Sequence, residues 1–273
     1  MSIFAAVQMT SGPDVGANLA AAAGLIESAA GSGAEVVLLP ENFNFMGSRD
    51  ADKREVAEAY GAGTTQEFLA RAALRHGIWI IGGTQPLRAA EPGGRVTNSC
   101  LVYDATGRCV ARYDKIHLFD VDVPDKPGET YRESVHVAPG HEVVMVDTPA
   151  GRVGLSVCYD VRFPELYRRL SAGGAEILVM PAAFTVPTGR AHWETLLRAR
   201  AIENLCYVVA AAQTGVHPNG RETYGDTLIV DWWGRVVTRL PRGSGFVSAP
   251  IDRDAIARGR ADFPALANRV LSC

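Results

Sequence analysis

The sequence predicts an α/β protein of four layers, in which two sheets pack face to face and helices cover their outer faces. Apolar runs of strand length alternate with helical segments along the 273 residues. Three segments of the first half recur in the second half in the same order: 34–43 at 175–184, 80–85 at 208–213, and 104–108 at 231–235. The alternative is that such segments are common strand patterns, but their preserved order favours a duplication. Two halves that each cover one sheet face with helices would bury their bare faces against each other.

The first half is expected to contain five strands and two helices. The helix over 18–30 is Ala-rich and is followed by Gly31 and Gly33, and the helix over 65–76 has an apolar face. The last two strands flank the turn Asp104–Gly107, which is a hairpin signal. The expected strands are 3–9, 34–43, 78–84, 96–103 and 108–113.

The second half is expected to follow the same plan after a loop-rich stretch over 114–150. A loop of that length is usually functional or disordered. The expected elements are a strand over 153–157, helices over 164–172 and 190–204, a strand over 206–212, and a hairpin over 227–230 and 235–240. We interpret the chain as a single domain over 1–273, with halves of about 1–145 and 146–250 and a C-terminal tail.

Composition and charge exclude several classes of partner. The net charge of −3 and the lack of a basic stripe argue against nucleic acid and against an anionic membrane surface. No apolar run is long enough to span a bilayer, and the N-terminus lacks the basic segment of a signal peptide. The five cysteines have no C-x-x-C spacing, which predicts a reducing cytoplasm and neither a zinc site nor disulfides. Cys100, Cys109 and Cys206 are expected in the core, and Cys273 at the exposed terminus.

Cys158 is the first candidate for chemistry. It ends the apolar run 153–157, shortly before Pro164 begins a helix, and ligands of open α/β sheets bind at that end of the strands. A free thiol has a pKa of about 8.5, so a nucleophilic cysteine needs a base or a nearby cation. The alternative is that Cys158 is a small buried hydrophobe.

Glu41 and Lys115 supply the missing groups. Glu41 lies at the end of the buried strand within 34–43, at a position where the second half has Ala182. A partly desolvated carboxylate there suits a general base. Lys115 follows the hairpin strand, where its ammonium group could stabilise an oxyanion and lower the pKa of the Cys158 thiol. Alternatively, Glu41 caps a helix or lies on the surface, and Lys115 is solvated like most lysines.

Three stretches around these residues carry a family resemblance. The segments 39–43 (Leu-Pro-Glu-Asn-Phe), 113–119 (Tyr-Asp-Lys-Ile-His-Leu-Phe) and 154–165 (Gly-Leu-Ser-Val-Cys-Tyr-Asp-Val-Arg-Phe-Pro-Glu) resemble the signatures of the nitrilase, or carbon–nitrogen hydrolase, superfamily. The resemblance implies the nitrilase-type αββα sandwich and a Glu41–Lys115–Cys158 triad without metal or organic cofactor. It also implies that Glu133 orients the lysine, that the Tyr159 N–H donates to an oxyanion, and that subunits pair as homodimers by continuing the sandwich.

Further stretches resemble the Nit subgroup, which contains deaminated glutathione amidases and ω-amidases. These are 117–124 and 191–204, and the segment 197–213 is more similar to the deaminated glutathione amidases. We expect a thiol amidase that cleaves a small carboxylate-bearing amide through a thioester and releases ammonia. Arg162 is the candidate carboxylate clamp, unless it forms a structural salt bridge. The alternatives are an ω-amidase acting on α-ketoglutaramate, a nitrilase or N-carbamoyl hydrolase, and a catalytically silent scaffold.

Overall fold

Two mixed sheets form the centre of the molecule, and the computed structural model describes residues 1–89, 94–122 and 130–271. The first sheet has the order β17-β1-β2-β3-β5-β4, and β6 also pairs with β5. Its strands are β1 (Ser2–Gln8), β2 (Val36–Leu38), β3 (Trp79–Ile81), β4 (Gln85–Arg88), β5 (Val96–Tyr103), β6 (Cys109–Asp114) and β17 (Gly245–Ile251).

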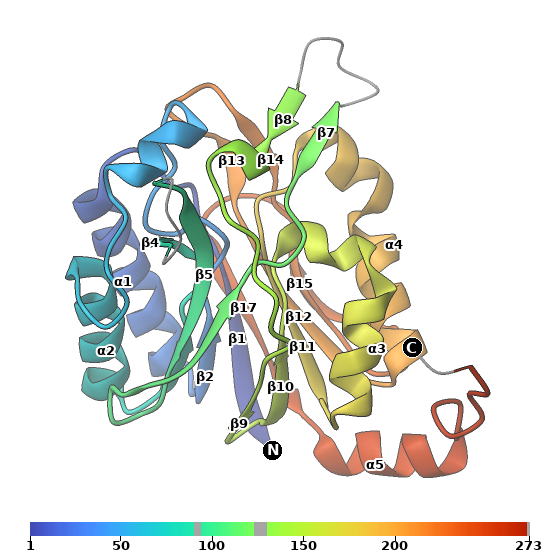
Figure 1. Cartoon of the computed structure of the whole chain (residues 1–273). Helices are drawn as coiled ribbons and strands as arrows, with labels where there is room; N and C mark the ends of the chain where they lie inside the picture. Colours follow the sequence, from blue (N-terminus) through green and yellow to red (C-terminus); the bar gives the residue numbers. More distant parts are fainter. Residues whose placement is uncertain (90–93, 123–129, 272–273) are drawn as a thin grey trace.

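The second sheet has the order β16-β15-β12-β11-β10-β9. Its strands are β9 (Met145–Thr148), β10 (Gly151–Leu155), β11 (Ile177–Ala182), β12 (Tyr207–Ala212), β15 (Thr227–Val230) and β16 (Val236–Leu240). Helices α1 (Val15–Gly31) and α2 (Thr64–His76) lie outside the first sheet, and α3 (Pro164–Ala172) and α4 (Val186–Asn204) outside the second (Figure 1). The predicted α-β-β-α layering is confirmed.

The two sheets repeat one topology. In each, three neighbouring parallel strands, β1-β2-β3 and β10-β11-β12, are followed by an antiparallel hairpin, β5-β6 and β15-β16. The three repeated sequence segments fall on corresponding places: β2 and β11, β3 and β12, and the two hairpin turns. The internal duplication is therefore present in the strand order.

Alternating side chains of the first sheet build two separate cores. In β1, Phe4 and Ala6 face the second sheet, whereas Ala5 and Val7 face α1 and α2. This follows from the twofold side-chain period of a strand. All four side chains are fully buried, so β1 is covered on both faces.

Several elements differ from the predictions. Helix α4 begins at Val186 rather than Arg190, because Pro187 suits the first turn of a helix. The predicted loop 114–150 holds β7 (Asp120–Asp122), β8 (Thr130–Arg132), the 3₁₀ turn η2 (Glu133–Val135) and β9, while 123–129 lie outside the described residues. The tail holds a helix, α5 (Arg253–Asp262), and β17 crosses back to pair with β1 of the first sheet.

The cysteines differ in exposure. Cys100 and Cys206 are buried as predicted, but Cys109 is exposed on β6, and Cys273 lies outside the described residues.

Of the helices within the described ranges, none combines the length and apolarity that crossing a bilayer requires.

Candidate active site

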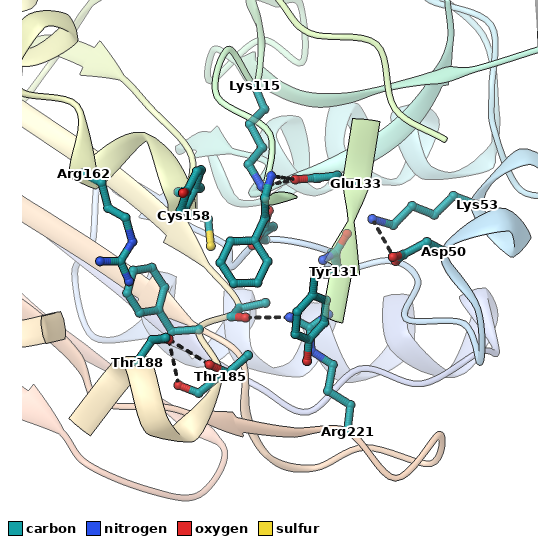
Figure 2. A pocket seen from close by; sticks show the side chains of 16 residues that line it. Asp50, Lys53, Lys115, Tyr131, Glu133, Cys158, Arg162, Thr185, Thr188 and Arg221 are labelled. Carbon is teal, nitrogen blue, oxygen red and sulfur yellow. Dashed lines mark hydrogen bonds and ion pairs between the residues drawn. The ribbon is translucent and has the colours of Figure 1, made fainter. Parts of the chain in front are cut away.

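Glu41, Lys115 and Cys158 line one pocket beyond the strand ends. Figure 2 shows Lys115 and Cys158 in this pocket. Glu41 follows β2, Lys115 follows β6, and Cys158 begins the 3₁₀ turn η3 (Cys158–Arg162) after β10. The pocket encloses about 510 Å³, including its open mouth. Its lining also contains every other predicted site residue, namely Glu133, Tyr159 and Arg162.

Lys115 is the centre of a buried polar network. Its Nζ lies 3.0 Å from Glu41 Oε1 and 2.8 Å from Glu133 Oε2, and Asn98 Nδ2 donates to the same Glu41 oxygen at 3.0 Å. Only 2% of the Lys115 side chain is exposed. Burial lowers the pKa of Lys115, but the charges of Glu133 and Glu41 outweigh it and hold this pKa well above its ordinary value.

Glu133 is held as a carboxylate by the same network. Burial raises its pKa, but the charges of Lys115 and Lys53 and the N–H of Phe119 lower it to about 2. The charge of Glu133, with Oε2 in contact with Nζ, therefore keeps Lys115 charged and fixed in position. The structure thus places Glu133 against the lysine that it was expected to orient.

Cys158 stands at a sharp turn between β10 and η3. Its φ of +51° lies in the left-handed region, which costs a non-glycine residue about 1–3 kcal/mol. Burial and the Glu41 charge raise the pKa of the thiol well above its ordinary value, while the Lys115 charge and the N–H of Ala183 lower it by less. Lys115 thus lowers the pKa of the thiol, as expected from the sequence, but desolvation and the Glu41 charge outweigh its effect, so the net shift is upward.

Asp160 joins the loop of the cysteine to the loop of the lysine. Its carboxylate is fully buried and accepts hydrogen bonds from the Tyr113 hydroxyl at 2.6 Å, the Val157 N–H at 2.8 Å and the His117 N–H at 3.0 Å. Nδ1 of His117 also lies 2.7 Å from Asp160 Oδ1, and its ring stacks on Phe163. Asp160 thus fixes the turn that carries Cys158 relative to the strand end that carries Lys115.

Tyr159 and Arg162 extend the pocket on the η3 side. The N–H of Tyr159 lies in the first turn of η3, where backbone donors lack an intrahelical acceptor. The Arg162 guanidinium lies 5.7 Å from the centre of the Tyr159 ring and 5.5 Å from that of Phe184. Its Nη1 is 3.3 Å from His192 Nδ1. No carboxylate within the described part of the chain forms an ion pair with Arg162, which leaves its charge available to a ligand.

Sequence reasoning missed several residues in and beside the pocket. Asp160, which supports the pocket from behind, had a signal, since it is a carboxylate two residues after Cys158 in a mostly apolar stretch. Lys53 and Arg221, which line the pocket, had none, because each lies in a polar segment outside the three motifs. Among residues 1–89, 94–122 and 130–271, no group of three His, Cys, Asp or Glu side chains is placed to hold a metal ion.

Comparison with known proteins decides the family. The family model described as carbon–nitrogen hydrolase matches residues 4–261. The chain belongs to the carbon–nitrogen hydrolase family. This carbon–nitrogen hydrolase is 46% identical over 270 residues to the deaminated glutathione amidase of a Synechocystis strain, covering 98% of each chain.

Two solved structures confirm the fold of this carbon–nitrogen hydrolase. The Caenorhabditis elegans NitFhit protein superposes with a TM-score of 0.89 at 41% identity, over 98% of this chain and 65% of that one. Saccharomyces cerevisiae Nit3, a member of branch 10 of the nitrilase superfamily, superposes with a TM-score of 0.88 at 30% identity, over 99% of this chain and 97% of that one. The molecule is therefore a nitrilase-type sandwich and an amidase-class hydrolase of carbon–nitrogen bonds.

Proposed function

We propose that the protein hydrolyses the amide bond of a small carboxylate-bearing substrate of the deaminated glutathione type, through a thioester on Cys158. The observation that carries this proposal is the joint placement of a thiol, a carboxylate and a doubly paired ammonium group in one pocket. Cys158 is the nucleophile, Glu41 the general base and Lys115 the cation that stabilises the intermediate.

The raised pKa of Cys158 explains why the base is needed. At neutral pH the thiol is protonated, and a thiolate beside Glu41 and Glu133 would add a negative charge to a buried group that holds two carboxylates and one ammonium. Transfer of the thiol proton to Glu41 leaves the total charge of the cluster unchanged. The base thus creates the nucleophile without adding charge to the buried site.

The remaining steps use the same groups. As the Cys158 sulfur bonds to the amide carbon, the carbonyl oxygen becomes an oxyanion held by Lys115 and the Tyr159 N–H. Collapse of this intermediate breaks the C–N bond, and the leaving amine takes the proton from Glu41. A water molecule that gives a proton to Glu41 then attacks the thioester, so the acid leaves and the thiol is restored.

The nature of the leaving group depends on the amide. A primary amide such as α-ketoglutaramate would release ammonia, the product expected from the sequence. Deaminated glutathione has a secondary amide and would release an amine, namely the cysteinylglycine part. Relatives that carry the deaminated glutathione name are 40–46% identical to this chain, which favours the secondary amide as substrate.

A substrate panel tests the proposal. The purified chain is assayed for 2-oxoglutarate release from deaminated glutathione and α-ketoglutaramate, and for hydrolysis of a nitrile and an N-carbamoyl amino acid. We expect the highest kcat/KM on deaminated glutathione and no turnover by Cys158→Ala. Equal turnover by the Ala variant, or no amide hydrolysis by the wild type, would refute it.

We further propose that the enzyme works in the cytoplasm as a homodimer. A thiol nucleophile must remain reduced, and Cys100, Cys109, Cys158 and Cys206 are all free. An aromatic surface cluster offers a candidate contact, since Trp233 is 45% and Phe263 51% exposed, with ring centres 5.5 Å apart. Sedimentation of the wild type and of Trp233→Ser would test the dimer and this contact.

A further inference from the structure

A second, polar pocket opens directly beside the active site. It shares Asn42, Asp50, Lys53, Tyr131 and Arg221 with the pocket of Cys158, and extends from them along 45–49 to Asn219. Neither Cys158 nor Arg162 lines it. A substrate that fills the active site can therefore reach the second pocket without a change in the fold.

Two cations stand at the junction of the pockets. Lys53 is only 13% exposed, and its one ion-pair partner in the described structure, Asp50, lies 3.9 Å away and is 39% exposed. The Lys53 charge reaches the active site, because it contributes to the lowered pKa of Glu133. Lys53 is therefore a largely shielded cation that Asp50 neutralises only weakly.

Arg221 is the second cation. Its Nη2 donates to the carbonyl of Ala183 at 3.0 Å, and its guanidinium lies 5.2 Å from the centre of the Tyr131 ring. Its Nε is buried and has no hydrogen-bond acceptor within the described residues. A buried donor without an acceptor is costly, and an anionic ligand would satisfy it.

The cations lie at two ends of the combined cavity. Figure 2 shows Arg162 on one side of Cys158, and Lys53 and Arg221 on the other. The leaving nitrogen must face Glu41, which gives it a proton. Because Asn42 follows Glu41 and lines both pockets, a group attached to that nitrogen would extend toward Lys53 and Arg221.

We propose that Lys53 and Arg221 form a subsite for a carboxylate on the leaving amine, separate from the acyl-side clamp Arg162. This inference rests on the proposed amidase function and deepens it. The subsite selects extended secondary amides that end in a carboxylate, such as deaminated glutathione. A primary amide such as α-ketoglutaramate has the same acyl group but leaves this subsite empty.

The test compares two substrates that differ only at the far end. These are deaminated glutathione and its C-terminal carboxamide, in which the glycine carboxylate is replaced by a neutral amide. The measured quantity is the ratio of their kcat/KM values. We expect the wild type to prefer the carboxylate by roughly tenfold to a hundredfold, the effect of one charge-assisted hydrogen bond.

Lys53→Gln is the primary variant and should bring this ratio close to one, mainly by raising KM for the carboxylate substrate. Arg221→Gln should lower the ratio as well, and serves as the second variant because it also loses the bond to Ala183. The matched control is Arg54→Gln, which removes an exposed charge from the same 3₁₀ turn (Asp50–Arg54) but lines neither pocket. It should keep the wild-type ratio.

The variant Arg162→Gln distinguishes binding of the acyl-side carboxylate from binding of the carboxylate on the leaving amine. It should lower kcat/KM for both substrates equally, since they share the acyl group. A wild-type ratio near one, an unchanged ratio in Lys53→Gln and Arg221→Gln, or a ratio that responds to Arg162→Gln instead, would overturn the subsite. Failure of the proposed function is distinct, because the wild type would then hydrolyse neither substrate.

Discussion

Lys115 Nζ lies 3.0 Å from Oε1 of Glu41, the same oxygen to which Asn98 donates. Neither donor bonds Oε2, so one oxygen of the carboxylate is held in position and the other is left to exchange a proton. Glu133 Oε2 accepts from the same ammonium group at 2.8 Å. In the proposed mechanism the two carboxylates therefore have separate roles, since Glu133 fixes the lysine and Glu41 carries the proton.

Replacing Glu41 with Gln should abolish most activity while preserving the fold. The amide keeps the shape of the side chain but cannot accept the thiol proton, so kcat should fall by about 10²–10⁴-fold. Glu27→Gln, which removes an exposed carboxylate from α1, is the matched control. A kcat within tenfold of the wild type would show that another group acts as the base.

Replacing Asp160 with Asn should reduce both stability and kcat. The new amide donor would face the Val157 N–H in the place of Oδ2, or the His117 N–H in the place of Oδ1, and a buried mismatch of this kind costs about 3 kcal/mol. Urea unfolding measures the loss. Tyr113→Phe, which removes one of the donors, should cost about 1 kcal/mol.

The kinetic signature of Asp160→Asn separates positioning from mere stability. Because the carboxylate fixes Cys158 relative to Lys115 without touching the substrate pocket, kcat should fall well below that of Tyr113→Phe, with KM little changed. A folded Asn variant with wild-type kcat would contradict the positioning role.

The depressed pKa of Glu133 predicts acid sensitivity. A carboxyl whose pKa falls from 4.5 to about 2 on folding stabilises the native state above 4.5, and this contribution is lost as the pH falls toward 2. The free energy of unfolding, measured in urea between pH 6 and pH 2, should therefore decline less steeply for Glu133→Gln than for the wild type. Parallel pH profiles would contradict the coupling of Glu133 to Lys115.

Arg162→Gln should weaken binding of the acyl-side carboxylate. We expect KM for deaminated glutathione to rise by roughly tenfold or more, since a charge-assisted hydrogen bond is lost. The same change should matter little for an analogue whose acyl-side carboxylate is a methyl ester. Arg169→Gln, on the exposed face of α3, is the control. An equal KM increase for acid and ester would indicate that Arg162 only packs on Tyr159 and Phe184.

The strand-end positions of Glu41, Lys115 and Cys158 could be predicted because each follows a recognisable strand, two in the first sheet (β2 and β6) and one in the second (β10). The repeated segments also allowed the face-to-face packing of the two sheets to be predicted. Glu133 could be identified as a site residue only through the family resemblance, since nothing in its own polar loop indicates burial.

Other features could not be predicted, because they depend on tertiary contacts. The thiol pKa is set by burial and Glu41 together, and neither magnitude can be read from sequence. β17 carries Pro250 and a partly exposed pattern, so its pairing with β1 has only a weak local signal. Lys53 and Arg221 meet through packing of loops that are distant in sequence.

The most direct test is the mass of the intact enzyme during turnover. Wild-type protein mixed with deaminated glutathione and quenched in acid should gain the mass of one 2-oxoglutaryl group, located on the peptide that contains Cys158 and absent from Cys158→Ala. An active enzyme that never carries this adduct under single-turnover conditions, or carries it on another residue, would contradict thioester catalysis by Cys158.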